Sequence, residues 1–382
     1  MNIMKSRAPN LLRLSFLGLL LVCCHQAAPQ EVAIWNNASD GFRSQALIRT
    51  GPPAASPSFI GPYDAQHGLA QEISRRIGSN IDALMGQLGT RIVLVSVDRQ
   101  IVYENYAMRW MRKATPLGYS MSKSLTAVAV GHALCADSRL SLQAKLEQHI
   151  PRLNGTSWGA ATIEDLLLMK SGSTRQEPER AGWQSDDVAA FHRRVYLGTH
   201  TSDVVEAMLA HDLKTFSPGE VYQYSNYDTL ALGLYVEAVT GKKFYDYFFQ
   251  VVWPSIGATK SGAWLVNELD QSFSAFGFSA SPEDWLRIGH YVLERMNNPD
   301  CLGQFLRRAI QPRERTHIPS RCYGYQIWNW CSRDVFFFFG YGGQYLIMHP
   351  ARRWVAYAHQ TSHMNDARLI QALRGVMNLP RD

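Results

Sequence analysis

The sequence has no C-x-x-C metal-binding pattern, no internal repeat and no low-complexity segment. Charged residues make up only 18% of its 382 residues, and the basic ones, which leave a net charge of +6, are scattered rather than clustered. Nucleic-acid binding needs clustered basic residues, so no nucleic-acid partner is expected. With 46% hydrophobic residues, the composition indicates a globular protein that buries a substantial core.

A good membrane-spanning segment is also lacking. The apolar run at residues 14–22 is too short and too close to Arg13 to span a bilayer. Basic residues precede this run, which is typical of a signal peptide, here expected to cover residues 1–28. An exported protein of the periplasm or outer envelope is therefore predicted. Cys23 and Cys24 follow the run directly; one of them can carry a lipid that attaches the protein to a membrane, or both belong to an ordinary signal.

Four further cysteines are present: Cys135, Cys301, Cys322 and Cys331. Residues 322–331 have the pattern of one strand, whose length of about 30 Å at ~3.3 Å per residue would exclude a bridge between its two end cysteines. Cys135 is expected to be a buried helix residue. A Cys301–Cys322 bridge is conceivable in an exported protein, but the spacing does not define the connectivity.

The chain after the signal divides into an irregular arm, residues 29–66, and one domain, residues 67–382. This domain is expected to be α+β, with strand patterns at both ends of a helical middle. The simplest packing is one antiparallel sheet built from both termini, flanked by helices, with an all-helical subdomain inserted at roughly 125–312. The expected elements are a helix at 67–88, a hairpin of strands 91–97 and 101–106, strands 322–331, 334–339, 343–349 and 354–360, and a helix at 364–377.

Two helix starts are marked by capping residues. Thr162 to Asp165 matches a capping box before Leu166, with Gly172 able to close that helix. Ser281 followed by Pro282 is typical of an N-cap and first helical position.

Ser120-Met121-Ser122-Lys123 carries the clearest chemical signal. The tetrad opens an apolar helix, so the serine and the lysine lie one turn apart on one face. A serine hydroxyl is a weak nucleophile until a base takes its proton, and a lysine can be that base if burial lowers its pKa. At the helix N-terminus, the backbone N–H of Ser120 can also stabilise an oxyanion.

Tyr224 and Asn226 form a second candidate element. They follow the turn signal at 218–220 and precede an amphipathic helix at 228–240. A loop can aim both side chains the same way, so that Tyr224 moves protons to a leaving group and Asn226 donates to a substrate carbonyl. The alternative is a surface turn with a tyrosine packed on its helix.

Gly340-Tyr341-Gly342-Gly343-Gln344 is the third element and precedes a strand. Glycines beside a strand let another backbone or a ligand approach closely. The N–H of Gln344 is then predicted to be the second oxyanion donor, with Tyr341 and Gly343 contacting substrate. The alternative is a tight hairpin turn.

In this order and spacing, the three elements resemble the penicillin-recognising serine hydrolases: class C β-lactamases, D-alanyl-D-alanine carboxypeptidases, and the related esterases and 6-aminohexanoate-dimer hydrolases. The resemblance covers roughly residues 90–378. It implies a β-lactamase/transpeptidase-like fold and no cofactor or metal. It also implies a nucleophilic Ser120, a base partner in Lys123, an acid and base in Tyr224, and a substrate-positioning amide in Asn226.

The third element departs from the β-lactamase pattern, which has Lys or His followed by Thr-Gly where this chain has Tyr341-Gly342-Gly343. The cation and hydroxyl that hold a substrate carboxylate are missing, which favours the esterase and 6-aminohexanoate-dimer hydrolase branch. Residues 171–195 contain no tyrosine, although a hydrolase of nylon oligomers would be expected to offer one. We therefore expect an esterase-like hydrolase of a small ester, amide or peptide. The alternatives are a β-lactamase or cell-wall peptidase, and a non-catalytic envelope binding protein.

Three other features have mainly structural interpretations. His359 and His363 have the spacing of a helical metal pair, but Gln360 replaces the glutamate of H-E-x-x-H, so no metal is expected. Phe336–Phe339 would place aromatic rings on both sides of a strand, chiefly as core. Trp183 and the acidic residues after it either rim a cleft or begin a helix.

Overall fold

The computed structural model describes residues 34–35, 47–173 and 203–377, apart from 69, 73–74, 76–84, 86–89, 332–333 and 361–365. Residues Glu31–Asp382 form one compact unit. The expected signal peptide and Cys23 and Cys24 lie outside the described residues. In the part of the chain that the structure describes, no helix is long and apolar enough to cross a membrane.

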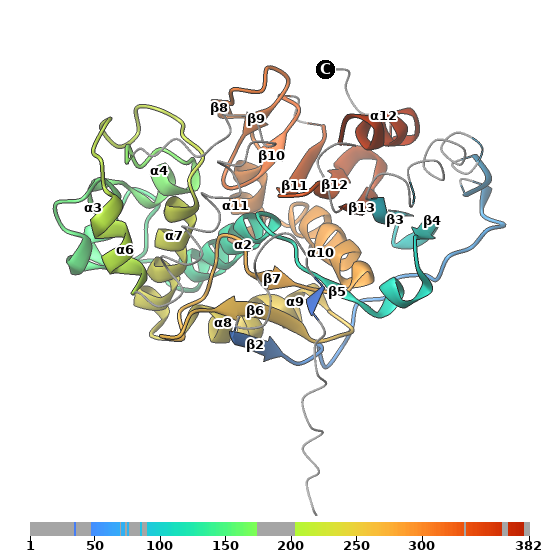
Figure 1. The fold of residues 1–382 in the computed structure, drawn as a ribbon, viewed down its shortest axis with the longest axis horizontal. Helices are drawn as coiled ribbons and strands as arrows, with labels where there is room; N and C mark the ends of the chain where they lie inside the picture. Colours follow the sequence, from blue (N-terminus) through green and yellow to red (C-terminus); the bar gives the residue numbers. More distant parts are fainter. Residues whose placement is uncertain are drawn as a thin grey trace, which may run out of the picture. The chain divides into compact units, whose positions relative to one another are not determined.

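The main sheet has eight strands in the order β4-β3-β13-β12-β11-β10-β9-β8, all paired antiparallel (Figure 1). Strands from the two ends of the domain meet where β3 pairs with β13. The prediction of an α+β fold with one antiparallel sheet from both termini is thus confirmed. The strands are β3 (Thr90–Val97), β4 (Gln100–Tyr106), β8 (Glu314–Arg315), β9 (Cys322–Tyr323), β10 (Trp328–Asn329), β11 (Phe336–Gly340), β12 (Gln344–His349) and β13 (Trp354–Gln360).

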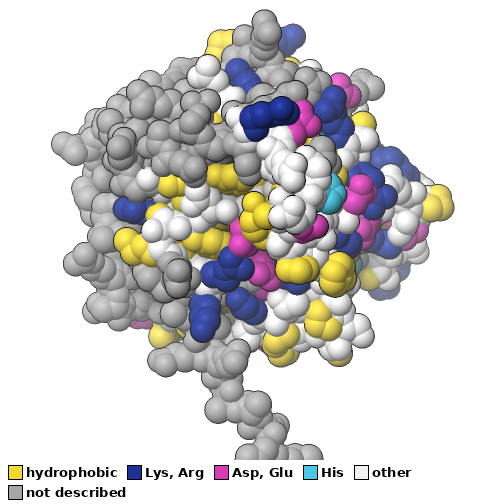
Figure 2. Space-filling model, turned by 90° about the vertical axis from the view of Figure 1, so that its right-hand side faces the viewer, with side chains coloured by type: hydrophobic (Ala, Val, Ile, Leu, Met, Phe, Trp, Pro, Cys, Tyr) yellow, Lys and Arg dark blue, Asp and Glu magenta, His cyan; other side chains and the backbone are white. Residues whose placement is uncertain are grey.

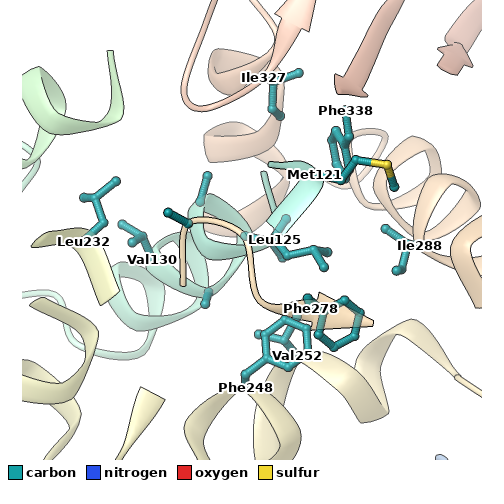
Figure 3. Packing of buried hydrophobic residues seen from close by; sticks show 14 of the residues in the cluster. Met121, Leu125, Val130, Leu232, Phe248, Val252, Phe278, Ile288, Ile327 and Phe338 are labelled. Atoms are coloured by element: carbon teal, nitrogen blue, oxygen red, sulfur yellow. The ribbon is translucent and has the colours of Figure 1, made fainter. Parts of the chain in front are cut away.

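Helices cover both faces of this sheet. On one face lie α2 (Met121–Ala136) and α10 (Pro282–Arg295), and Figure 3 shows Met121 beside Phe338 in the core between them. On the other face, α12 (Asp366–Met377) buries Leu369, Ile370 and Leu373. Because strand side chains alternate, Phe336 and Phe338 enter the first core and Phe337 and Phe339 the second, as predicted.

Both predicted helix caps are present. The side chain of Thr162 accepts from Asp165 N, and the carboxylate of Asp165 accepts from Thr162 N, at the start of α4 (Ile163–Leu167). At the start of α10 the side chain of Ser281 accepts from Asp284 N, and Pro282 is the first residue of this helix. The sequence therefore identified these two starts from local hydrogen bonding alone.

The region 125–312 is mainly helical, but it also contains strands. The prediction that this region is all-helical is therefore wrong. Its helices are α3 (Ser157–Ala160), α4, α6 (Val204–His211), α7 (Asn226–Thr240), α8 (Phe244–Tyr247), α9 (Trp253–Ile256) and α11 (Cys301–Ala309), besides α2 and α10. A second sheet of β6 (Gly262–Val266) and β7 (Phe278–Ser279) lies within the same region. Since β6 is fully buried, its residues do not alternate in polarity, and the period-2 signal of a strand is lost.

The N-terminal arm is also more ordered than predicted, because it supplies the third strand of that sheet. β2 (Leu47–Gly51) pairs antiparallel with β6, and β1 (Ile34–Trp35) pairs parallel with β5 (Thr115–Pro116). Most of the helix expected at 67–88 lies outside the described residues. Met85, within the expected helix, forms a β-bridge with Thr90 instead.

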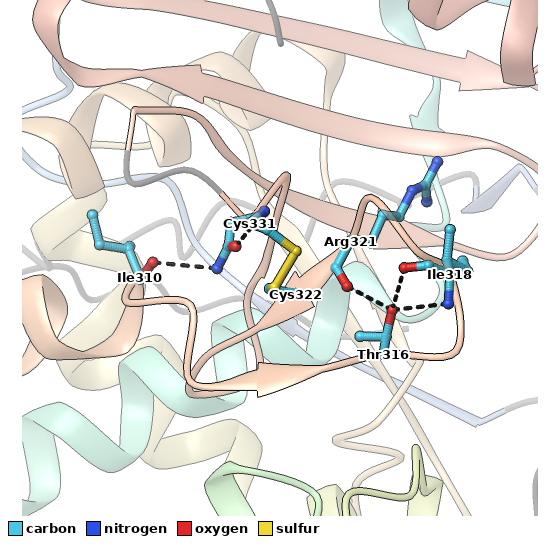
Figure 4. The surroundings of a disulfide bond; sticks show 7 residues. Ile310, Thr316, Ile318, Arg321, Cys322 and Cys331 are labelled. Carbon is cyan, nitrogen blue, oxygen red and sulfur yellow. Dashed lines mark hydrogen bonds between the residues drawn. A yellow bond between two sulfur atoms is a disulfide. The ribbon is translucent and has the colours of Figure 1, made fainter. Parts of the chain in front are cut away.

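The prediction of one continuous strand over 322–331 is wrong. The chain turns back between β9 and β10, where Gly324 N donates to Ile327 O (2.8 Å) and Gln326 adopts a left-handed φ of 57°. An ideal Cβ at Gly324 would lie 2.0 Å from Ala309 O, so only glycine fits there. The two ends of the segment are therefore neighbours, and Cys322 and Cys331 form a disulfide with a Cα–Cα distance of 4.8 Å (Figure 4).

A second disulfide joins Cys135, near the end of α2, to Cys301, the first residue of α11. Cys135 is therefore a bridged, partly buried residue rather than a buried thiol, and the conceivable Cys301–Cys322 pairing is wrong. The bridge links residues 166 positions apart and fastens the end of the helix that Ser120 begins.

One face of the molecule shows how charged side chains are distributed. On the face drawn in Figure 2, basic, acidic and apolar side chains are interspersed over the described residues. This distribution agrees with the scattered basic residues of the sequence.

The two disulfides should contribute unequally to stability, because one closes a loop of 166 residues and the other a loop of nine. Loop-closure entropy predicts a loss of about 5 kcal/mol of unfolding free energy for Cys135→Ser with Cys301→Ser, against about 3 kcal/mol for Cys322→Ser with Cys331→Ser. Denaturant unfolding of the two double variants measures both losses. An equal or reversed order would contradict the chain-entropy explanation.

Candidate active site

Ser120 lies at the N-terminus of α2, as predicted, and is its N-cap residue. The segment before it is held by β7: Gly118 N donates to Phe278 O (2.8 Å), and Leu117 bridges Ser279. Tyr119 has a left-handed φ of 48° and is buried. A non-glycine residue in this region costs roughly 1–3 kcal/mol, so the surrounding packing imposes the sharp bend that presents Ser120.

Lys123 is 1% exposed, although it bears an ionisable amine. Its Nζ lies 3.3 Å from Ser120 Oγ, donates to the backbone oxygen of Ala275 (3.1 Å), and donates to the side-chain oxygen of Asn226. The partners come from α2, the segment before β7 and α7. The lysine therefore joins three parts of the chain around the serine hydroxyl, as a buried amine must be surrounded by polar partners.

Tyr224 reaches the same amine from the loop before α7. Lys123 Nζ lies 5.0 Å from the centre of the Tyr224 ring. The ring packs against Tyr323 and Trp328, with centroids 6.0 and 5.5 Å away. The crosslinked β9–β10 hairpin thus holds Tyr224 beside Lys123, and the Tyr224 ring and the Asn226 side chain both lie next to the Lys123 amine.

Asn226 is the first residue of α7, which starts two residues earlier than predicted, with Ser225 as N-cap. Asp228 follows in the first turn and is completely buried. Its carboxylate accepts from Ser171 Oγ (2.7 Å), Ser171 N (3.2 Å) and Trp158 Nε1 (2.9 Å). Burial raises the pKa of Asp228 to about 6, because these hydrogen bonds offset only part of the desolvation.

The glycine-bearing turn lies against the segment that precedes Ser120. An ideal Cβ at Gly340 would lie 2.2 Å from Gly118 O, so the end of β11 approaches that backbone more closely than any other residue type allows. The Tyr341 ring packs edge-on against Tyr119, with centroids 6.0 Å apart. Gly342 and Gly343 both have positive φ, and Gln344 begins β12 with its side chain buried.

The structure therefore brings Ser120, Lys123, Tyr224 and Asn226 together, with the turn of Tyr341, Gly343 and Gln344 next to the Ser120 segment. The sequence did not predict the hydrogen bond from Lys123 to Ala275 O, because every residue has a backbone carbonyl and none marks this one. It also missed Asp228, although the Ser225-to-Asp228 spacing is a capping signal.

Of the remaining candidates, only His359 lies within the described residues. His359 is buried, which lowers its pKa to about 3, and His363 lies outside the described residues. Among the residues that the structure describes, no group of three or more metal-ligating side chains occurs. Trp183 lies outside the described residues, with the rest of the segment 174–202.

The profile of the Beta-lactamase family matches residues 77–374. Because this match covers most of the sequence, the chain belongs to the Beta-lactamase family, the penicillin-recognising serine hydrolases, and has their α+β fold. The predicted resemblance is thereby confirmed.

The individual relatives have low sequence identity to this chain. A 6-aminohexanoate-dimer hydrolase of Paenarthrobacter ureafaciens is 22% identical over 217 residues, which are 54% of this chain and 52% of that protein. The chain thus matches about half the length of this curated relative.

Two solved structures share the fold. A Bacillus anthracis protein assigned as a 6-aminohexanoate-dimer hydrolase has a TM-score of 0.72 and 19% identity, with 88% of this chain and 92% of that one covered. EstCE1, a hydrolase with promiscuous acyltransferase activity, has a TM-score of 0.61 and 15% identity, with 80% and 98% covered. At these identities the likeness concerns the fold.

Replacing Gly340 by alanine should strain the contact between β11 and the Ser120 segment. The new Cβ would overlap Gly118 O, so one backbone must move, at a cost of about 1–3 kcal/mol in unfolding free energy. Gly68→Ala is the matched control, because no atom lies within 4 Å of its Cβ position. Thermal unfolding compares the two; equal stabilities would show that β11 does not press on that segment.

The raised pKa of Asp228 should appear as a pH-dependent stability. Because its pKa in the folded state, about 6, exceeds the ordinary value of 3.8 for an aspartate, its contribution is present below pH 4 and is lost as the pH rises through 6. The stability of the wild type relative to Asp228→Asn should therefore fall by about 3 kcal/mol between pH 4 and pH 7. Urea unfolding at both pH values measures this difference, and a pH-independent difference would contradict the assignment.

Proposed function

We propose that this protein is an esterase-like serine hydrolase that cleaves an ester or amide bond through an acyl-enzyme on Ser120. The observation that carries this proposal is the position of Lys123. Its buried amine lies 3.3 Å from Ser120 Oγ and contacts both the Tyr224 ring and Asn226. An amine placed in this way can take the proton that limits serine as a nucleophile.

The reaction then proceeds in two displacements. Ser120 Oγ forms a bond to the carbonyl carbon, and its proton passes to the Lys123 amine and from there to Tyr224. The bond to the leaving group breaks, and Tyr224 returns the proton to the departing oxygen or nitrogen. Water attacks the acyl-enzyme with the same groups as base, releasing the acid and restoring the Ser120 hydroxyl.

The oxyanion of each tetrahedral intermediate needs backbone donors. Ser120 N at the start of α2 is the first, and the turn after Gly340 supplies the second. The sequence predicts Gln344 N for this role. The close contact between Gly340 and Gly118 makes the next N–H in the chain, that of Tyr341, a second candidate in the same turn.

The substrate is a small ester or amide with an uncharged group near the reacting carbonyl. This inference is supported by the sequence Tyr341-Gly342-Gly343, which offers neither the cation nor the hydroxyl that holds a carboxylate in β-lactamases. The relatives named as 6-aminohexanoate-dimer hydrolases and as a hydrolase with acyltransferase activity are consistent with acyl transfer on this fold.

Export of the protein is part of the same proposal. It is supported by the signal-type pattern of residues 1–28 and by the two disulfides, since structural disulfides persist in oxidising compartments such as the periplasm.

The test is hydrolysis of a short-chain p-nitrophenyl ester by the wild type and by Ser120→Ala. The variant should lose about 10³-fold or more of kcat, because no other hydroxyl replaces the nucleophile. Ser124→Ala is the matched control: this serine lies on the same helix but donates to Gln326 O, and its loss should leave the rate within a few fold.

A fluorophosphonate probe gives an independent result. It should label the peptide that contains Ser120 in the wild type and in Ser124→Ala, but not in Ser120→Ala. Unchanged hydrolysis by Ser120→Ala would refute the proposal. Rapid turnover of nitrocefin in place of the ester would favour a β-lactamase, and absence of any labelling would favour a binding protein.

A further inference from the structure

The turn that carries the second oxyanion donor has little rigidity of its own. Gly342 and Gly343 are consecutive glycines with positive φ, and the backbone bond within the turn runs from Gly343 N to Gly340 O (3.2 Å). Glycine has the largest conformational freedom of all residues. An oxyanion donor, in contrast, must be held within about 0.5 Å of its position to be effective.

Two buried glutamine side chains donate hydrogen bonds to backbone carbonyls of this turn. Gln344 Nε2 donates to Tyr341 O (3.1 Å), and Gln360 Nε2 donates to Gly343 O (3.2 Å). The Gln344 side chain also bonds to the backbone of Gln360: Gln344 Nε2 donates to Gln360 O (2.7 Å), and Gln360 N donates to Gln344 Oε1 (3.3 Å). Two carbonyls of the turn are therefore each bonded to a side chain with no exposed surface.

Gln360 owes its position to an irregularity in the sheet. It is the last residue of β13, and the pairing with β3 shifts by one residue between His359 and Gln360. A β-bulge of this kind redirects the following side chain. Thr90 Oγ1 then donates to Gln360 Oε1 (3.2 Å), which leaves the amide nitrogen directed at the turn. A chain of hydrogen bonds thus runs from β3 through β13 to Gly343.

We propose that Gln360, with the side chain of Gln344, is a positioning residue for the oxyanion donor of the turn Tyr341–Gln344. This inference rests on the proposed function, because it assigns that turn to the reaction. Gln360 contacts the turn and not the substrate, so it acts through the backbone that it holds. A buried amide network with its partners satisfied is rigid, and removing one member leaves buried carbonyls unpaired.

The first test is Gln360→Leu, which keeps the volume of the side chain and removes its hydrogen bonds. The turn should move, so kcat for the p-nitrophenyl ester should fall about 10-fold or more while KM changes little, since loss of a complete oxyanion donor costs about 10²–10³. Ser96→Ala is the matched control. Ser96 also hydrogen-bonds β13, through Val355 O, and His290, but far along the strand from the turn.

The second variant, Gln360→Glu, separates positioning from general stability. Its carboxylate can still accept from Thr90, but when ionised it presents an oxygen to Gly343 O and repels it. When protonated, it can donate to Gly343 O as the amide does. Its activity relative to the wild type should therefore rise as the pH falls through the pKa of the new carboxyl. A ratio that does not change with pH would overturn the proposal.

Hydrogen exchange makes the test independent of catalysis. The peptide containing residues 340–345 should exchange faster in Gln360→Leu than in the wild type or in Ser96→Ala. Unchanged exchange, or a fall in melting temperature with an unchanged kcat, would refute the positioning role. If Ser120→Ala retained full activity while the exchange result held, the proposed function would fail and Gln360 would remain the support of the turn.

Discussion

The burial of Lys123 is the constraint to which the rest of the site adjusts. A lysine amine that is 1% exposed needs polar partners from every side, and the chain supplies them from elements far apart in sequence: Ser120, Asn226 and the backbone of Ala275. Each partner needs its own support. Asp228 anchors the start of α7, β7 holds the segment before Ser120, and the β9–β10 hairpin holds Tyr224. The polar centre of the site is thus arranged around one amine.

The elements that the sequence predicted well are those whose signals are local. Capping residues identified the starts of α4 and α10, and short apolar and aromatic runs identified the strands from β11 to β13. The Ser-to-Lys spacing identified the N-terminus of α2. Each of these patterns depends on contacts within one or two turns of chain. The grouping of Tyr224 and Asn226 with Lys123 needed the family resemblance, since local spacing alone equally fitted a surface turn.

The predictions that were wrong concern elements that depend on contacts between distant parts of the chain. The turn at Gly324 depends on the end of α11 pressing against it, and the disulfide between Cys322 and Cys331 follows from that turn. β6 becomes a strand because β2 pairs with it from the N-terminal arm, a long-range contact that hydrophobic periodicity does not register. The bulge that directs Gln360 to the glycine turn likewise depends on pairing between β3 and β13.

The close contact at Gly340 has a consequence for how this site can change over evolution. The requirement there falls on the backbone, since an ideal Cβ at Gly340 would lie 2.2 Å from Gly118 O, whereas the next side chain, that of Tyr341, makes only an edge-on ring contact with Tyr119. Positions beside the glycine can therefore exchange a cation or a hydroxyl for an aromatic ring without disturbing the nucleophile. A scaffold with this division can change which acyl groups it accepts while conserving the machinery that cleaves them, and one fold can then serve unrelated substrates.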